Sequence, residues 1–425
     1  MRTSSKALIA IGAVLAVLAG LWALIAPGQL VKYPSDLDKT PVLQGTFTLY
    51  LDPATGAPRV RPEVLPLTIH RRIHVVSSTG SQAVVREDDV EKIGPLPQQD
   101  LQQQYVISRT SIKNIASPQA YAYSPTTVVN RAPAYSINLP FDTGAGPYEI
   151  WKNEVGRSYT FRQQGDTLTS NGLTLIPLQG ELTNAPAKPY YLAQLRALGL
   201  PAQTTIQRLA PQLRALGLDP AQLSATLLPK LSAADRAAVQ SALSQPIGLN
   251  YVVSVKTQLL VEPTTGAIVS LHSINQTLGV QPAFAALGQI GAILTKAQYR
   301  AVPVIRIAVA TLTQLAKSPP TAKVFNLAYA QTPASVTDIA AYTKNKADAI
   351  DLAKTTIPLV LLLAGVLSAA VGVGIFLVGR RGAGRPPTAT RTGTETPPGP
   401  APSGTSRPAG DHGDDKPPAR PQVRE

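Results

Sequence analysis

The motif in this sequence that most suggests catalysis is Asp142-Thr143-Gly144, which follows Pro140-Phe141. In aspartic proteases, two such motifs place two carboxylates close enough to share one proton. This chain carries one copy, so a protease would need two chains to complete the site. Asp-Thr-Gly is also an ordinary turn between strands, because an Asp side chain bonds its own backbone and Gly accepts a positive φ. We favour the turn, and a dimeric protease is the alternative.

A pair of histidines, His70 and His74, lies four residues apart and offers two metal ligands. The surrounding residues predict a strand, in which His70, Arg72 and His74 share one face while Ile69 and Ile73 share the other. The Arg72 cation would then lie between the two supposed ligands. We therefore expect a solvent-exposed strand face and no metal site.

An acidic run, Glu87, Asp88, Asp89 and Glu91, could bind Ca²⁺. It lacks the regularly spaced oxygen ligands and the turn glycine of a dedicated calcium loop. We interpret the run as a solvent-exposed turn.

Other catalytic signatures are missing from the sequence. H-E-x-x-H, G-x-S-x-G and phosphate-binding loops do not occur, and the chain has no cysteine for a disulfide or a thiolate. The sequence therefore predicts a protein that is not an enzyme and has no cofactor. The formal net charge of +14 is spread along the chain. It forms no basic, aromatic-interleaved stripe, which argues against nucleic acid as a partner and indicates membrane lipids instead.

Two apolar segments, residues 7–26 and 357–378, contain no charged residue. At about 1.5 Å of rise per residue, each is long enough to cross a hydrocarbon core of about 30 Å as a helix. Arg2 and Lys6 precede the first segment, and Arg380 follows the second. Because cations near a span stay on the cytoplasmic side, we expect a two-pass protein of the plasma membrane with both termini in the cytoplasm.

A cleaved signal peptide is the alternative interpretation of the first segment. A signal h-region has about 7–15 residues and ends in a small-x-small site. The segment here is longer and ends in Leu24-Ile25-Ala26 before Pro27, so a retained anchor is favoured.

Changes in composition predict the domain boundaries and an α+β fold. An antiparallel, β-rich extracytoplasmic domain lies between two transmembrane helices and contains a helical insertion. The predicted parts are an N-terminus at 1–6, spans at 7–26 and 357–378, the domain at 27–356 and a disordered, Pro-rich cytoplasmic tail at 379–425. Pro397 and Pro400 in the tail fit a P-x-x-P ligand for a cytoplasmic partner.

Runs of β-branched and aromatic residues separated by turns predict short antiparallel strands. The predicted strands are residues 46–51, 67–76, 82–85, 105–108, 134–139, 148–151, 158–161, 249–262, 267–278 and 323–329.

Helix signals separate these strands. The insertion at 190–245 is rich in Ala, Leu and Gln, with Asp219-Pro220 as cap and first turn and a capping box from Ser232 to Asp235. Residues 283–317 are apolar but contain Lys296, Arg300 and Arg306. Burying such cations in a membrane costs about 2.5–3.5 kcal/mol each, so we expect helices with one apolar face. Residues 337–354 are predicted to form a stalk helix that leads into the second span.

Small residues recur at a spacing of four on both predicted spans and predict that the spans pair antiparallel within one chain. These residues are Gly12, Ala16, Gly20, Ala364, Ser368 and Gly372.

Several stretches resemble an actinobacterial family of uncharacterised membrane proteins labelled porin PorA. They are residues 121–159, with Ala122-Tyr123-Ser124-Pro125 and Trp151-Lys152-Asn153-Glu154, and residues 261–266. The resemblance spans most of residues 1–380, apart from the helical insertion at 190–245 and the tail, and implies a protein of the cell envelope without a defined chemistry. A pore needs a closed barrel or several helices around a lumen, and two single spans provide neither.

The layout of two anchors and a β-rich domain is also similar to that of class B scavenger receptors, which implies a lipid-carrying interior. We therefore expect a domain that binds or hands on a lipid or another hydrophobic ligand. A structural or assembly protein that binds other proteins is the alternative. The residues expected at the ligand site are Arg196, Arg214, Ile290, Leu294, Ile305 and Leu312.

Overall fold

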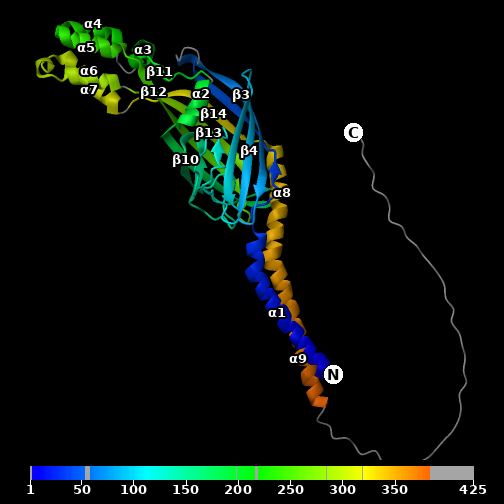
Figure 1. Ribbon diagram of the computed structural model, residues 1–425. Helices are drawn as coiled ribbons and strands as arrows, with labels where there is room; N and C mark the ends of the chain where they lie inside the picture. The colour runs from blue at the N-terminus through cyan, green and yellow to red at the C-terminus, as the bar shows by residue number, and fades with distance from the viewer. Residues whose placement is uncertain are drawn as a thin grey trace, which may run out of the picture.

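Long antiparallel strands form the centre of the molecule (Figure 1). The computed structural model describes residues 2–52, 58–197, 199–215, 219–283, 285–317 and 319–382. The long strands are β2 (Val42–Leu51), β3 (Pro58–Ser78), β4 (Gln82–Ile93), β5 (Gln99–Ser108), β7 (Tyr148–Lys152), β8 (Arg157–Gln163), β10 (Leu173–Pro186), β12 (Ile247–Val261), β13 (Ile268–Pro282) and β14 (Ala322–Gln331). The short strands are β1 (Asp38–Lys39), β6 (Tyr121–Ala122), β9 (Leu168–Ser170) and β11 (Gln203–Thr204).

These strands make one curled sheet with the order β6-β5-β4-β3-β2-β14-β13-β12-β10-β8-β7. Residues 109–147 cross between the two edges of the sheet. Within this crossing segment, Asn114 bridges Ile107 of β5 and Tyr135 bridges Ile150 of β7. The segment thus connects the two edges where strand pairing ends.

Glu262 organises the turn of the β12–β13 hairpin. Its carboxylate accepts hydrogen bonds from the backbone N–H groups of Thr264 and Thr265 at 2.9 and 2.8 Å. The turn ends at Gly266, whose φ of +67° suits glycine. A side chain there would also collide with the carbonyl oxygen of Leu139, 2.2 Å from an added Cβ. The hairpin turn therefore packs closely against the crossing segment.

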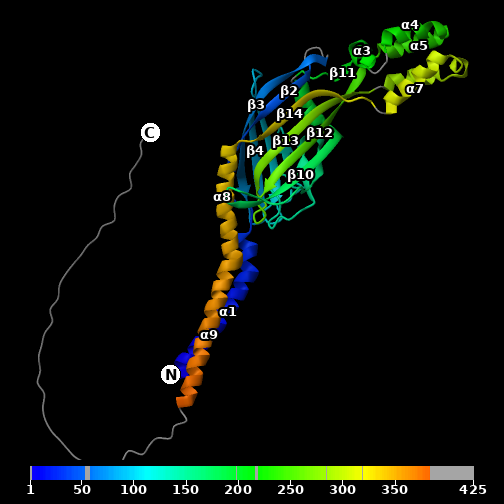
Figure 2. The same cartoon turned by 180° about the vertical axis from the view of Figure 1, so that it is seen from behind.

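A helical head lies at one end of the sheet (Figures 1 and 2). Its helices are α3 (Ile206–Ala215), α4 (Pro220–Leu227), α5 (Ala233–Ser244), α6 (Ala285–Leu294) and α7 (Pro303–Lys317), with short 3₁₀ turns η2 (Leu228–Lys230) and η3 (Ala297–Tyr299). Helix α2 (Pro189–Ala197) instead packs against the sheet, with Tyr191 and Leu195 buried in the core of the sheet. The head has an apolar core of its own, which includes Ile206, Leu213, Leu227, Leu231, Val239, Ile290, Leu294, Tyr299, Ile305 and Leu315.

Two long helices extend beyond the opposite end of the sheet, and the first part of the second one packs against the sheet through Val336 and Ala340 (Figure 1). They are α1 (Arg2–Leu30) and a continuous helix made of α8 (Pro333–Asp351), the π-helical turn η4 (Leu352–Thr356) and α9 (Ile357–Gly382). The segments Lys6–Ile25 and Pro333–Val378 are long and apolar enough to cross a membrane. Trp22 of α1 donates a hydrogen bond of 3.0 Å from its indole N–H to the carbonyl oxygen of Ala353 in η4. The first helix is thereby fixed to the second at the π-helical turn.

The predicted α+β fold class is confirmed, with differences in detail. Residues 134–139 were predicted as a strand but form an irregular segment, with Ile137 and Leu139 buried as core residues. Strand β10 was not predicted, because Pro177, Gly180 and Asn184 interrupt its pattern of strand-forming residues. The predicted tail at 379–425 lies outside the described residues from residue 383 onward.

Candidate ligand cavity

A cavity of about 1330 Å³ lies inside the curl of the sheet. Alternate residues of the strands face it, because successive side chains of a strand point to opposite faces. On β2, Leu43, Phe47 and Leu49 line the cavity and Thr48 between them does not. The volume exceeds the roughly 300–1,000 Å³ of ordinary small-molecule pockets, so it has room for a long ligand.

The lining of this cavity runs the length of the domain. At one end it includes Lys32, just after α1, and Ile350, near the end of α8. At the other end it includes Leu209 and Leu213 of α3. Since the two long helices and the head lie at opposite ends of the sheet (Figures 1 and 2), the cavity extends from the top of the apolar helices to the head.

The part of the cavity near the head is mostly apolar. Phe47 of β2 and Phe325 of β14 contribute neighbouring rings, with centroids 5.2 Å apart. Other apolar lining residues in this part are Leu49, Leu51, Leu195, Leu200, Leu209, Leu213, Leu249 and Val280.

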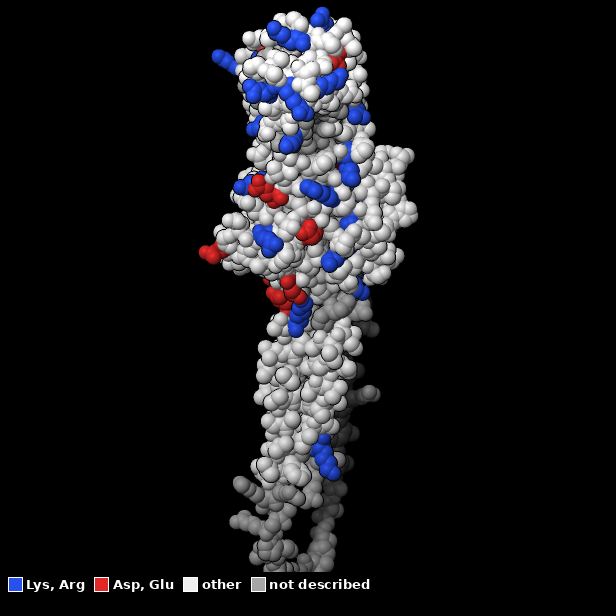
Figure 3. Space-filling model, turned by 90° about the vertical axis from the view of Figure 1, so that its left-hand side faces the viewer, with Lys and Arg blue, Asp and Glu red and all other residues white. Residues whose placement is uncertain are grey.

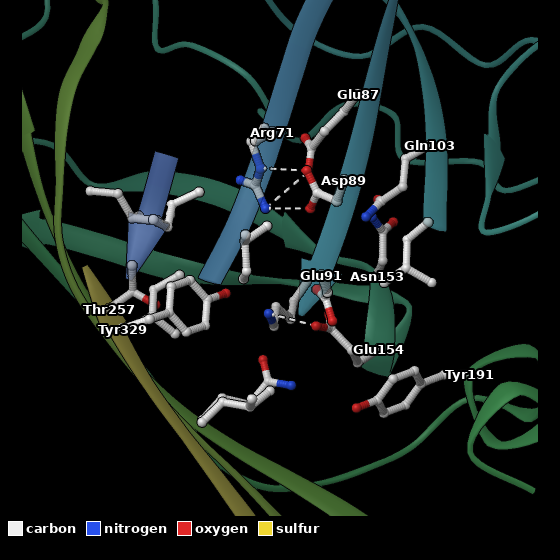
Figure 4. A pocket seen from close by; sticks show the side chains of 18 of the residues that line it. Arg71, Glu87, Asp89, Glu91, Gln103, Asn153, Glu154, Tyr191, Thr257 and Tyr329 are labelled. Atoms are coloured by element: carbon white, nitrogen blue, oxygen red, sulfur yellow. Dashed lines mark hydrogen bonds and ion pairs between the residues drawn. The ribbon is translucent and has the colours of Figure 1, made fainter. Parts of the chain in front are cut away.

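A polar belt crosses the middle of the cavity (Figure 4). We define it as Arg71, Glu87, Asp89, Glu91, Gln103, Lys152, Glu154, Tyr191, Gln276 and Tyr329, all of which line the cavity. The three carboxylates of β4 belong to it because residues 87, 89 and 91 alternate with outward-facing neighbours. The prediction of a solvent-exposed turn for this acidic run is wrong: the run is a strand, and Glu87 and Asp89 are 6% and 5% exposed.

Arg71 compensates two of these carboxylates. It lies opposite Asp89 in the pairing of β3 with β4, and its guanidinium donates two hydrogen bonds, of 2.8 and 2.7 Å, to the Asp89 carboxylate. Its Nη2 also lies 3.2 Å from the Glu87 carboxylate. Lys152 and Glu154 form a second ion pair of 2.8 Å. Among the described residues, no three His, Asp or Glu side chains converge as metal ligands.

Burial changes the acidity of the belt. Desolvation raises the pKa of Glu87 to about 7, with Arg71 opposing the shift. It raises the pKa of Glu91 to about 7 as well, and the neighbouring Asp89 adds to the effect. Burial also raises the pKa values of Tyr191 and Tyr329. Both phenols are therefore neutral hydrogen-bonding groups at any physiological pH.

The residues that the sequence suggested for ligand binding lie elsewhere. Ile290, Leu294 and Ile305 are buried in the core of the head. Leu312 lies on α7, and its side chain is outside the described part of the structure. Arg196 and Arg214 are exposed on α2 and α3, where Arg214 lies 3.4 Å from Asp219. None of these described side chains lines the cavity.

Asp142 lies in a tight turn between two other parts of the chain. The Thr143 N–H donates a hydrogen bond of 2.8 Å to the carbonyl oxygen of Pro263, and Asp142 itself has a φ of +56°. Its exposed carboxylate forms an ion pair of 2.8 Å with Lys354 of η4. The motif therefore ties the domain to the base of the second long helix. His70 and Arg72 are exposed on β3, as expected for a solvated face, whereas the side chain of His74 is only 12% exposed and lies 3.6 Å from the Asp88 carboxylate.

The two long helices lie side by side and touch through small residues (Figure 2). A Cβ added to Gly12 would lie 2.5 Å from the carbonyl oxygen of Gly365, and one added to Gly372 would contact Ile9. A Cβ added to Gly365 would lie 3.2 Å from the backbone nitrogen of Ala16. Ala364 and Ser368 are half-buried beside this face, whereas Gly20 is exposed and has open space around it.

Comparison with known proteins identifies the family of this chain. No curated protein matches the chain, and no comparison supports the analogy with class B scavenger receptors. A family model described as porin PorA matches residues 4–374, which include both long helices, the curled sheet and the head. The chain belongs to the porin PorA family.

Proposed function

We propose that this protein is anchored in the cell envelope, binds a lipid or another long-chain amphiphile inside the curled sheet, and hands it on between the membrane and the head. The observation that carries the proposal is the continuous cavity, lined by Ile350 at the anchored end and by Leu213 at the head. A chain leaving a bilayer at the top of the two helices would find an apolar path through the domain.

The energetics favour a hydrocarbon chain as the occupant. Each CH₂ group transferred from water to an apolar wall contributes about 0.8 kcal/mol. An extended chain can contact Phe47, Leu49 and Phe325 in turn along the part near the head. The bound chain loses conformational freedom, and this cost offsets part of the free energy gained by the transfer.

The family name would suggest conduction through a pore. In this chain, Gly12 of α1 and Gly365 of α9 bring the two backbones into contact, which leaves no lumen between these helices. The cavity lies in the domain that the helices carry. We therefore propose a carrier and not a channel.

We also propose that both termini are cytoplasmic and that the sheet and head lie outside the plasma membrane. Because the chain has no cysteine, single substitutions report exposure cleanly. Ser81→Cys, on an exposed loop of the sheet, should react with a membrane-impermeant maleimide on intact cells, and Ser403→Cys in the tail should not. Labelling of position 403 from outside would overturn this orientation.

Mass spectrometry of an organic-solvent extract of the purified protein tests the carrier proposal. Leu49→Trp would fill the apolar part of the cavity, and Thr48→Trp would place the same bulk outside the lining. We expect lipid to co-purify with the parent chain and with Thr48→Trp, and to fall several-fold with Leu49→Trp. If lipid is absent from the domain in all three proteins while stable protein partners co-purify, the function is assembly of the envelope.

A further inference from the structure

The polar belt contains two cations that the protein has already paired. Arg71 is held by Asp89 and Glu87, and Lys152 is held by Glu154. These contacts leave neither cation free to compensate an anion brought into the cavity. The belt holds four carboxylates against two cations, so its formal charge is acidic when all groups are ionised.

Glu91 is the carboxylate of the belt that is not compensated in this way. Within the described residues, no side chain or backbone N–H donates a hydrogen bond to it, although it faces the cavity with Asp89 on the same strand. Its side chain is half-buried, and a poorly solvated carboxyl group requires hydrogen-bonding partners. A ligand with donor groups would supply them.

The remaining groups of the belt are neutral. They are two phenols and two amides that line the cavity, from Tyr191, Tyr329, Gln103 and Gln276. Such groups both donate and accept hydrogen bonds, which suits hydroxyl groups of a ligand. The other charged residues of the lining lie toward its two ends: Lys32, Asp36, Lys39, Arg109 and Lys346 at the anchored end, and Asp52 and Arg208 at the head.

We propose that the polar belt binds the polar group of the amphiphile, and that this group is uncharged and carries hydroxyl groups. An anionic headgroup is excluded from the belt, because it would lie beside the unpaired Glu91 carboxyl group in a poorly solvated space, where both cations of the belt are already paired. This assignment rests on the proposed function and specifies the class of ligand.

Trp151 allows a direct test, because it lines the cavity and the chain has two tryptophans. In a Trp22→Phe background, Trp151 is the sole indole and lies in the domain, away from the apolar helices. Bromine on an alkyl chain quenches an indole that the chain contacts. The full-length Trp22→Phe protein, in nanodiscs of unbrominated lipid, would be titrated with brominated amphiphiles of one chain length. Their headgroups would be glucoside, sulfate and primary ammonium.

We expect the glucoside to quench Trp151 at a concentration at least about tenfold lower than the sulfate. Equal or tighter binding of the sulfate would overturn the proposal, and tighter binding of the ammonium would overturn the assignment to an uncharged group. If no amphiphile quenches Trp151, the proposed carrier function itself fails.

A matched pair of variants assigns the selectivity to the belt. Glu91→Gln removes the uncompensated charge and should raise the affinity for the sulfate several-fold, with little change for the glucoside. Asp88→Asn changes the neighbouring carboxylate, which does not line the cavity, and should change neither. A Glu91→Gln protein that binds glucoside normally and still excludes the sulfate would contradict the role of Glu91.

Discussion

The guanidinium of Arg131 lies 2.9 Å from the side-chain oxygen of Asn153 and joins the two edges of the curled sheet. Asn153 directly follows β7, the last strand in the sheet order. Arg131 also donates hydrogen bonds of 2.9 and 2.7 Å to the backbone oxygens of Gln104 and Tyr121, on β5 and β6 at the other edge. With 1% of its surface exposed, this side chain helps to keep the curl closed around the cavity.

Replacing Arg131 by Met should destabilise the domain strongly. The substitution removes the donor to the carbonyl oxygens of Gln104 and Tyr121, and each buried acceptor left without a partner costs about 1–3 kcal/mol. The Asn153 oxygen keeps its hydrogen bond from the Trp151 indole N–H. Thermal unfolding followed by tyrosine fluorescence should show a midpoint several degrees lower. Arg72→Ala is the control, because the Arg72–Asp38 pair is about half exposed and contributes about 0–1 kcal/mol. Equal effects of the two substitutions would contradict the role given to Arg131.

Stability should fall as the pH rises from about 4.5 to about 7. Glu87 and Glu91 have pKa values raised to about 7 in the folded domain, so in this range the folded state binds more protons than the unfolded chain. The stabilisation is present at low pH and is lost as the carboxyl groups ionise inside the cavity. Glu91→Gln should therefore be more stable than the parent chain at pH 8 and similar at pH 5. Parallel pH profiles for the two proteins would refute this assignment.

The contact between α1 and α9 should be sensitive to side-chain size. Gly12→Ile, which is incompatible with a Cβ 2.5 Å from the Gly365 oxygen, should separate the helices. Oxidation of an Ala16→Cys, Ser368→Cys protein should form a disulfide within one chain, and Gly12→Ile should abolish it. Val17 and Leu367 are 61% and 65% exposed, so cysteines at these two positions serve as the unpaired control. If crosslinks formed only between chains, the helices would pair between two copies of the protein and not within one chain.

The head is expected to bind anionic surfaces. Lys and Arg side chains are scattered over the end of the molecule that carries the head (Figure 3). Arg196 and Arg214 are exposed there, and reversing both to Glu should weaken binding to anionic liposomes and reduce its dependence on salt. Neutral liposomes provide the control. Unchanged binding by the double variant would identify these arginines as an ordinary solvated surface.

Local signals predicted local structure well. Asp219 caps α4 by accepting a hydrogen bond of 3.0 Å from the Ala221 N–H, and Ser232 caps α5 through the Asp235 N–H. These contacts involve residues a few positions apart, so the chemistry that forms them is visible in the sequence. The turn at Gly266 was predictable for the same reason.

The polar belt was not predicted because it depends on pairing between strands. The sequence shows a cluster of acidic residues, but it does not show that Arg71 lies opposite Asp89 across β3 and β4. Alternation along β4 was the available signal, since Val85, Glu87 and Asp89 are spaced by two. The apolar residues of α6 and α7 were predicted to line a ligand site, and those that are described lie in the core of the head. Sequence alone does not separate the two cases, because a helical core and an apolar ligand site have the same composition.

Photocrosslinking with a diazirine-bearing fatty acyl chain tests the central claim most directly. After irradiation of the full-length protein in a membrane, peptide mapping should find adducts on the inward-facing residues of β2 and β14, such as Leu49 and Phe325, together with adducts on the apolar helices. Leu49→Trp should remove the strand adducts and leave those on α1 and α9. Adducts confined to α1 and α9 in the parent chain would contradict the claim that the cavity holds a lipid chain.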